Sequence, residues 1–345
     1  MTFVTKAMRT ALAGVVAAGI GGAAMAQEVT LKMHQFLPPQ ANVPKLILQP
    51  WADRIMEASD GRIKIDHYPA MQLGGKPPEL ASQVTDGVAD IIWTVAGYTP
   101  GRFPQAEVFE LPFMMTNAEA TSRAFWQYAE ANMMDSDFSD IKILGVWVHG
   151  PGVIHSSSPV NEIADLNGLK VRGPTRVITG MLTDLGATAV GLPVPAIPEA
   201  LSKGVIDACV IPWEVTAALK VPELVQNHTV FGGEALYTTA FIFAMNKDKY
   251  ESLPDDLKAI IDEHTGEDFS AMAGKLQAGA DVPSRKLAED MGNNIIDLTP
   301  EQVAEWKDAA SGTEAKWIEE MDGKGFDGQA LVDQAKSLIE ENTTE

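Results

Sequence analysis

One stretch decides the fold of this chain: Gly168-Leu169-Lys170-Val171-Arg172-Gly173-Pro174-Thr175-Arg176. It predicts a short strand, a Gly-Pro turn and the start of a helix that runs to about residue 185. Arg172 therefore stands where the strand ends, and in open α/β sheets ligands bind outside the carboxyl ends of the strands. A guanidinium there matches a carboxylate with two parallel hydrogen bonds. We predict that Arg172 binds a carboxylate, with an ordinary surface ion pair as the alternative.

The segments on both sides of this stretch alternate between strand and helix patterns. Upstream, apolar alternation predicts strands over 29–35, 62–68, 90–95 and 141–149, with helices over 43–58, 78–85 and 117–134. Downstream, strands are expected over 153–157, 168–172, 187–190 and 206–211, with helices over 175–185 and 197–203. Two successive βα series predict an α/β protein of two lobes.

The rest of the chain is expected to complete these lobes. The apolar strand over 237–245 returns to the first series, and helices follow over 254–291, with a break near Pro283, then over 300–320 and 327–341. The segment Gly150-Pro151-Gly152 is a plausible crossing point between the lobes. We therefore predict a first lobe of residues 27–150 plus about 237–295, and a second lobe of 151–236 plus about 296–345.

The first 26 residues have the pattern of a cleavable export signal. Lys6 and Arg9 precede an apolar run over 11–20, and Ala24-Met25-Ala26 is a small-x-small cleavage site. The expected mature chain starts at Gln27 and is exported to the periplasm. Its single cysteine, Cys209, has no partner for an intrachain disulfide.

Net charge excludes one class of partner. The chain carries a formal charge of −21, and removal of Lys6 and Arg9 gives −23. Nucleic-acid binding requires a basic surface, so we expect no such partner. No later apolar run is long enough to insert into a membrane.

The sequence lacks the common catalytic and cofactor motifs. Neither phosphate-binding glycine motif lies between a strand and a helix, no G-x-S-x-G elbow is present, and the six histidines lack zinc-ligand spacing. We therefore expect no metal and no cofactor.

Strand ends, by contrast, carry aromatic and polar residues suited to a small-molecule pocket. The candidate ligand-binding residues beside Arg172 are Phe36, Trp93, Tyr98, His149, His155, Trp213 and Glu214. Pro212 should end its strand, so we expect Trp213 and Glu214 to emerge into the cleft near Arg172. Glu214 has three open roles: contact with a donor on the ligand, pairing with a cation, or capping of the following helix.

Several segments together resemble the periplasmic solute-binding proteins of TRAP (tripartite ATP-independent periplasmic) transporters, of the dicarboxylate-binding type. They are S-D-G-R-I-K-I-D-H-Y-P-A-M-Q-L-G-G, Q-V-T-D-G-V-A-D-I, A-D-L-N-G-L-K-V-R-G-P and A-L-S-K-G-V-I-D-A. The resemblance implies two lobes with mixed sheets, crossing strands at the hinge and a long bracing helix. It also implies that Arg172 is the carboxylate-binding arginine, and that lobe closure delivers an organic acid to a sodium-driven permease.

Two departures from the family pattern bear on the ligand. Many members carry a second arginine where this chain has Gly152 or Val153, and Asn or Gln where it has Ile211. A small or partly aromatic monocarboxylate therefore fits better than a sugar acid. The alternative from another class is a secreted lyase or hydrolase that uses His149 or His155 as base with Glu214.

Overall fold

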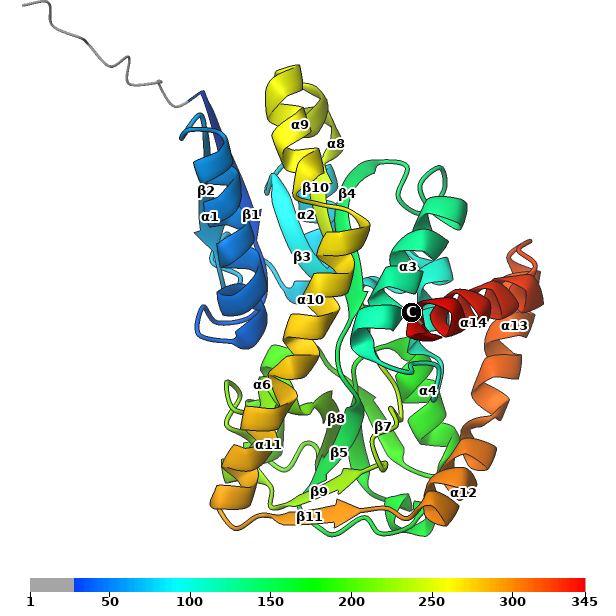
Figure 1. Ribbon diagram of the computed structural model, residues 1–345. Helices are drawn as coiled ribbons and strands as arrows, with labels where there is room; N and C mark the ends of the chain where they lie inside the picture. The colour runs from blue at the N-terminus through cyan, green and yellow to red at the C-terminus, as the bar shows by residue number, and fades with distance from the viewer. Residues whose placement is uncertain (1–27, 345) are drawn as a thin grey trace, which may run out of the picture.

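A computed structural model describes residues 28–344, which form two sheets with helices packed around them (Figure 1). The predicted signal peptide lies outside the described residues. The first sheet has the order β2-β1-β3-β10-β4. Its strands are β1 (Val29–His34), β2 (Ile63–Tyr68), β3 (Ile91–Val95), β4 (Ile141–Val148) and β10 (Ala240–Asn246). β10 runs antiparallel to both of its neighbours, so the sheet is mixed.

The second sheet has the order β11-β9-β5-β8-β6-β7. It contains β5 (Gly152–Ser156), β6 (Lys170–Gly173), β7 (Thr188–Gly191), β8 (Ala208–Pro212), β9 (Asn227–Val230) and β11 (Asn294–Asp297). β6 is parallel to β7 and to β8, whereas β5 is antiparallel to β8 and β9. We call each sheet with the helices packed on it a lobe, the first lobe containing β1 and the second β6.

Helices cover both sheets. Those of the first lobe and its edge are α1 (Gln49–Ala58), α2 (Leu80–Thr85), α3 (Ala118–Asn132), α8 (Lys247–Glu251) and α9 (Asp255–Glu263). The second lobe carries α4 (Arg176–Asp184), α5 (Ile197–Ser202), α6 (Trp213–Thr216) and α7 (Val221–Leu224). The C-terminal helices are α12 (Pro300–Ala310), α13 (Gly312–Gly323) and α14 (Gly328–Thr344). Two 3-10 turns, η3 (Ala96–Tyr98) and η4 (Pro104–Glu110), follow β3.

The long helical segment braces both lobes, as the resemblance implied. α10 (Glu267–Gly279) packs on α3 and β4, and α11 (Asp281–Asp290) continues it to α6 of the second lobe. Figure 1 shows the two helices running one after the other along the molecule. The helix breaks at Ala280, three residues before Pro283, close to the predicted position. Pro283 lies in the first turn of α11, where its missing N–H needs no partner.

The chain passes between the lobes from β4 to β5 and again from β9 to β10, and these two crossings touch. The backbone N–H of Gly152 donates to the carbonyl of Tyr237 at 3.0 Å. A Cβ at position 152 would lie 2.7 Å from that carbonyl oxygen, so only glycine fits there.

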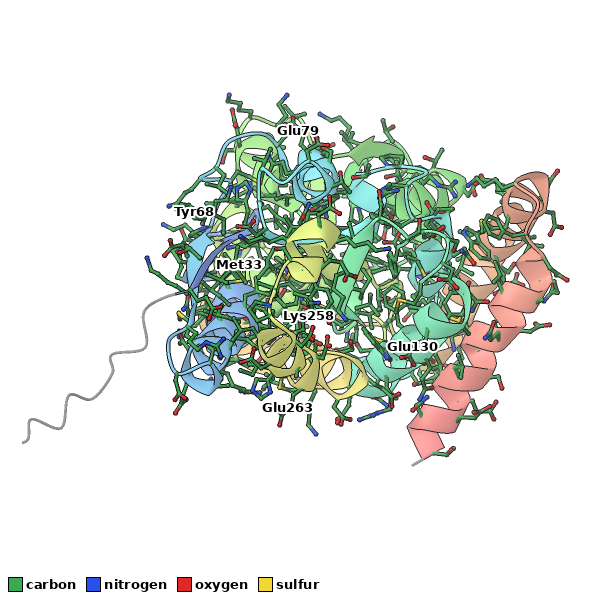
Figure 2. All side chains as sticks on the ribbon, turned by 90° about the horizontal axis from the view of Figure 1, so that it is seen from above. Met33, Tyr68, Glu79, Glu130, Lys258 and Glu263 are labelled. Carbon is green, nitrogen blue, oxygen red and sulfur yellow. The ribbon has the colours of Figure 1, made fainter. Side chains whose placement is uncertain are left out.

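The C-terminal helix lies elsewhere than the sequence placed it. α14 packs on α3 of the first lobe, whereas we expected residues after about 296 to belong to the second. Viewed from above, α14 lies on the side of Glu130 in α3 and away from Tyr68 at the end of β2 (Figure 2). α12 and α13 lead the chain from β11 back to the first lobe (Figure 1).

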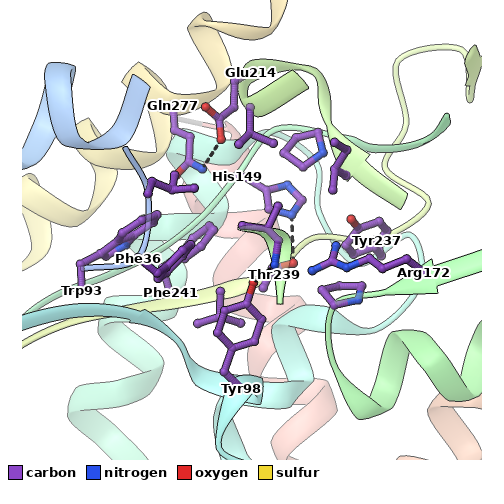
Figure 3. A pocket seen from close by; sticks show the side chains of 17 residues that line it. Phe36, Trp93, Tyr98, His149, Arg172, Glu214, Tyr237, Thr239, Phe241 and Gln277 are labelled. Carbon is purple, nitrogen blue, oxygen red and sulfur yellow. Dashed lines mark hydrogen bonds between the residues drawn. The ribbon is translucent and has the colours of Figure 1, made fainter. Parts of the chain in front are cut away.

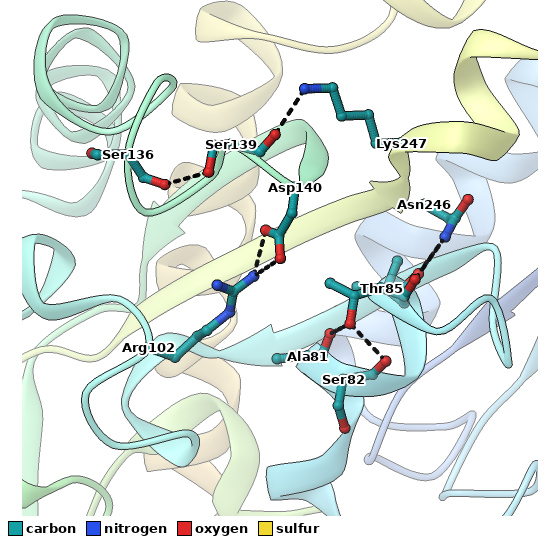
Figure 4. Close-up of polar contacts among 10 residues, drawn as sticks. Ala81, Ser82, Thr85, Arg102, Ser136, Ser139, Asp140, Asn246 and Lys247 are labelled. Atoms are coloured by element: carbon teal, nitrogen blue, oxygen red, sulfur yellow. Dashed lines mark hydrogen bonds and ion pairs between the residues drawn. The ribbon is translucent and has the colours of Figure 1, made fainter.

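Polar contacts fasten the outer end of the first sheet (Figure 4). The guanidinium of Arg102 pairs with the carboxylate of Asp140, and Lys247 Nζ donates to the carbonyl of Ser139 at 2.7 Å. Asn246 Nδ2 donates to the carbonyl of Thr85 at 3.3 Å. These contacts tie the end of β10 to the loops beside it, away from the carboxyl ends of the second sheet.

Candidate functional site

Arg172 lies buried at the end of β6, with one nitrogen unpaired. Its side chain is 1% exposed, Nε donates to the carbonyl of Leu192 at 2.7 Å, and Nη1 donates to the carbonyl of Val210 at 3.0 Å. Nη2 has no hydrogen-bond partner within residues 28–344. The two carbonyls fix the plane of the guanidinium, so its free edge offers a preorganised site for an anion.

Arg172 borders a narrow cavity between the lobes, with about 40 Å³ of space for water-sized molecules (Figure 3). The lining residues come from both lobes and from α10: Phe36, Leu37, Trp93, Val95, Tyr98, His149, Arg172, Pro174, Val194, Ile211, Pro212, Glu214, Val215, Tyr237, Thr239, Phe241 and Gln277.

Aromatic rings form one wall of this cavity. Phe36 stacks on Trp93 with ring centroids 4.6 Å apart and planes at 16°, and Phe241 stacks on the same indole at 5.0 Å. Figure 3 shows the three rings together on the side away from Arg172. Stacked rings of this kind present an apolar, flat surface that suits another planar group.

Two polar side chains of the first lobe also border the cavity. Tyr98 Oη accepts a hydrogen bond from the backbone N–H of Val194 at 2.8 Å, across the lobes. Burial lowers the pKa of His149 to about 4, so its imidazole is neutral. His149 Nδ1 donates to the carbonyl of Gly150 at 2.5 Å, and Nε2 accepts from the Thr239 hydroxyl at 3.0 Å. Arg172 is therefore the only cation among the cavity residues.

Glu214 lines the cavity from the first turn of α6. Its carboxylate is 2% exposed, and Oε1 accepts from Gln277 Nε2 at 2.9 Å. Burial raises the pKa of Glu214 to about 7. The backbone N–H of Glu214 donates to Asp281 Oδ1 at 2.7 Å, so the capping group of this helix end comes from α11 and not from Glu214 itself.

Trp213 and His155 do not line this cavity, contrary to the sequence-based expectation. Trp213 lies 4.9 Å, centroid to centroid, from the rings of both His155 and His228, inside the second lobe. His155 Nδ1 is 2.7 Å from His228 Nδ1, and its Nε2 donates to the carbonyl of Ile211. Because Pro212 leads directly into a helical turn, successive residues point to different sides, and of Trp213 and Glu214 only Glu214 faces the cavity.

The other six candidates, Phe36, Trp93, Tyr98, His149, Arg172 and Glu214, all border the cavity. The sequence analysis missed Tyr237, Thr239, Phe241 and Gln277. The first three belong to the predicted strand over 237–245, whose apolar composition predicted only a return to the first lobe. Gln277 lies in α10, and nothing local distinguishes it from the other polar residues of a surface helix.

The fold and cavity are those of a two-lobed solute receptor. The chain belongs to the bacterial extracellular solute-binding protein family 7, whose model matches residues 35–320. It is a solute-binding receptor of the TRAP type and not an enzyme, so the lyase or hydrolase alternative is set aside. Within residues 28–344, no helix is long and apolar enough to cross a membrane.

Solved structures of this class are closely similar. A TRAP solute-binding protein of Rhodoferax ferrireducens, crystallised with copurified benzoate, is 49% identical, with a TM-score of 0.90 over 92% of this chain and 99% of that chain. A marine metagenome protein described as specific for aromatic acid ligands, in complex with 3-hydroxybenzoate, is 52% identical, with a TM-score of 0.89 over 92% and 99%. A Bordetella bronchiseptica protein with bound mandelate is 27% identical, with a TM-score of 0.82 over 91% and 99%.

Proposed function

We propose that this receptor captures a small aromatic monocarboxylate in the periplasm and delivers it to a TRAP permease. The unpaired, buried Nη2 of Arg172 carries this proposal, because it places one anion-binding edge in a cavity walled by aromatic rings. An incoming carboxylate would supply the missing acceptor, and a charge-assisted hydrogen bond to a fixed guanidinium is among the stronger contacts available to a protein.

The charges of the cavity favour one carboxylate over two. Arg172 is the only cationic side chain that borders it, and the other ionisable group that can carry charge near neutral pH is Glu214. A second carboxylate on the ligand would face an acidic group and no cation, which is unfavourable in a desolvated site. The bound ligands of the similar structures, benzoate and 3-hydroxybenzoate, have the proposed composition.

Ligand entry requires the lobes to separate. Arg172 and the rings of Phe36 and Trp93 are at most 2% exposed, so a ligand cannot reach them in this arrangement of the lobes. A ligand that touches both lobes stabilises the closed arrangement. We assign this closure to capture, and the division near residues 150 and 236 to the hinge.

A ligand panel tests the proposal. The chain without residues 1–26 is unfolded, refolded to remove any copurified acid, and melted with benzoate, succinate, N-acetylneuraminate and benzamide. Benzamide keeps the ring and loses the charge, so it is the matched control. We expect only benzoate, among the four compounds, to raise the melting temperature. At a benzoate concentration of about 100 times Kd, binding should stabilise the folded protein by about 2.7 kcal/mol. Stabilisation by succinate or benzamide equal to that by benzoate would refute it.

A further inference from the structure

A second polar group of the cavity is left incomplete, at Glu214. Its Oε1 accepts from Gln277, whereas Oε2 has no hydrogen-bond partner within residues 28–344 and is fully buried. A buried acceptor without a partner costs about 1–3 kcal/mol. Since Glu214 borders the cavity, that partner can be part of the bound molecule.

The position of this carboxylate is fixed from three sides. The Trp147 indole, which can only donate, gives its N–H to Gln277 Oε1 at 2.8 Å, so the amide must turn its Nε2 toward Glu214. Asp281 holds the backbone N–H of Glu214, and Asn42 Nδ2 donates to its backbone carbonyl at 2.6 Å. The free oxygen is therefore held in place before any ligand arrives.

The surroundings show what kind of group Oε2 can meet. Glu214 forms no ion pair in the described part of the chain, and no cluster of three metal-ligating side chains occurs there. Asp281 is acidic too, and burial together with the charge of Glu214 raises its pKa well above the ordinary range. A further carboxylate would be repelled here. A neutral group with a hydrogen to donate fits both the charge and the missing contact.

The carboxylate lies away from Arg172 within one cavity. β6 and β8 are neighbouring parallel strands, and Arg172 of β6 lies opposite Cys209 of β8. Arg172 and Glu214, which follows β8, therefore both lie at carboxyl ends of strands in the same sheet. Figure 3 shows Glu214 and Gln277 together on one side and Arg172 on another. An aromatic ring that rests on the aromatic wall can place its carboxylate at Arg172 and a ring substituent at Glu214.

We propose that Glu214 determines specificity by hydrogen bonding a hydroxyl group on the ring of the bound acid, so that the preferred ligands are hydroxy-substituted aromatic monocarboxylates. This inference rests on the function proposed above. A phenolic hydroxyl donates to a carboxylate and accepts from a carboxyl group, so it satisfies Oε2 in either protonation state. A methoxy group in the same place offers no donor.

Titration calorimetry tests this with benzoate, 2-, 3- and 4-hydroxybenzoate and the matching methoxybenzoates. In the unmodified protein, we expect one hydroxy isomer to bind about tenfold or more tightly than benzoate, because a site built for a hydroxyl discriminates against its absence. At a pH well above the Glu214 pKa of about 7, where the carboxylate has no hydrogen to donate, the corresponding methoxy acid should bind no better than benzoate.

The quantity to compare between variants is the ratio of the hydroxybenzoate affinity to the benzoate affinity. In Glu214→Leu this ratio should fall to about one, and Glu214→Gln should give an intermediate value. Asp137→Asn is the matched control, because Asp137 is a buried carboxylate, hydrogen-bonded to Gln105, that does not border the cavity. It should leave the ratio unchanged.

The outcomes separate the two proposals. If benzoate binds but no hydroxyl isomer gains affinity, or if folded Glu214→Leu keeps the full ratio, the role of Glu214 is refuted while the receptor function stands. If Glu214→Leu does not fold, the test is the affinity of the unmodified protein for each hydroxybenzoate and for the matching methoxybenzoate. Equal affinities refute the inference. If none of the aromatic acids binds, both the proposed function and this inference are refuted.

Discussion

Two neighbouring strands of the second sheet end at the same cavity, yet their corners differ in charge and in anchorage. β6 carries Arg172 and turns through Gly173-Pro174 into α4, whereas β8 ends at Pro212 and turns at once into α6, which carries Glu214. The first corner presents the cation and the second the acid. Equal positions in a parallel sheet thus give the cavity two ends of different chemistry.

The β6 corner is tied to the opposite lobe. Thr175 Oγ1 donates to Glu110 Oε2 at 2.6 Å, and Arg176 Nε donates to Glu107 Oε1 at 2.7 Å. The turn is tight: a Cβ at Gly173 would lie 3.1 Å from the backbone of Thr179 and closer to its hydroxyl. The residue that meets the ligand and those that join the lobes are therefore next to each other in the chain.

The β8 corner is anchored mainly within its own lobe and on the bracing helix, with one bond to the first lobe, from Asn42 Nδ2 to the Glu214 carbonyl. Trp213 is buried against Val153, Val230 and Ala288 as well as the histidine pair. Glu214 is held by Gln277 of α10 and Asp281 of α11. The comparison indicates that the β6 corner takes part in closure, whereas the β8 corner positions a contact.

Removal of the Trp213 side chain should give the largest effect, and it should be one of stability. Trp213→Ala empties a buried site in the second lobe, which typically costs about 3–5 kcal/mol of unfolding free energy. Denaturant unfolding measures the loss, and Trp126→Ala, at a half-buried site of α3, is the matched control and should cost less. Affinity for benzoate, measured where the variant is still folded, should change little. A large loss of affinity with intact stability would place Trp213 in the site after all.

Arg172→Lys should give the next largest effect, on affinity. Lysine keeps the charge. Its ammonium group, however, cannot donate to the carbonyls of both Leu192 and Val210 and at the same time offer a planar N–H edge to the ligand. We expect benzoate binding to weaken by about 1.5–3 kcal/mol, or about 10- to 150-fold. Titration calorimetry measures the loss, with a melting curve to show that the variant is folded.

Arg102→Lys is the control for that experiment, because Arg102 pairs with Asp140 on the exposed outer end of the first lobe. It should leave benzoate affinity unchanged. Undiminished binding by Arg172→Lys would remove Arg172 from the carboxylate site and with it the contrast between the two corners.

The sequence predicted the two-lobed α/β fold because βα alternation and the turns between elements are local signals. Phe36, Trp93 and Arg172 were found for a related reason: carboxyl ends of parallel strands gather at one edge, so residues there can be grouped without knowing the strand order. The short strands β9 and β11 were missed. Their pairing joins segments far apart in the chain, β11 with β9 and β9 with β5, and no local pattern indicates it.

Contacts between distant segments account for what else the sequence did not predict. Gln277 reaches the cavity only because α10 crosses from one lobe to the other. His155 points inward to His228, a pairing between residues 73 positions apart that no spacing rule indicates. Trp213 and Glu214 were grouped because they are adjacent, but a helical turn separates their directions. The sequence therefore indicates which residues lie at the ends of strands, but it does not indicate in which direction the side chain of the next residue points.

The smallest expected effect tests whether the β6 corner joins the lobes. Thr175→Val keeps the shape of the side chain and removes its hydroxyl, so Glu110 Oε2 loses its donor in the closed arrangement, where Thr175 is 4% exposed and Glu110 is fully buried. In an open arrangement water can solvate both groups, so the cost of about 1 kcal/mol falls on the closed form alone. Since ligand binding requires the closed arrangement, benzoate affinity should fall about fivefold.

Thr183→Val on the exposed face of α4 is the control, because its hydroxyl bonds only within the helix, to the carbonyl of Thr179. Small-angle scattering at a fixed, subsaturating benzoate concentration should show a larger mean radius of gyration for Thr175→Val than for Thr183→Val. Equal affinities and equal radii for the two variants would mean that this contact does not bias closure, and the β6 corner would then differ from the β8 corner in charge only.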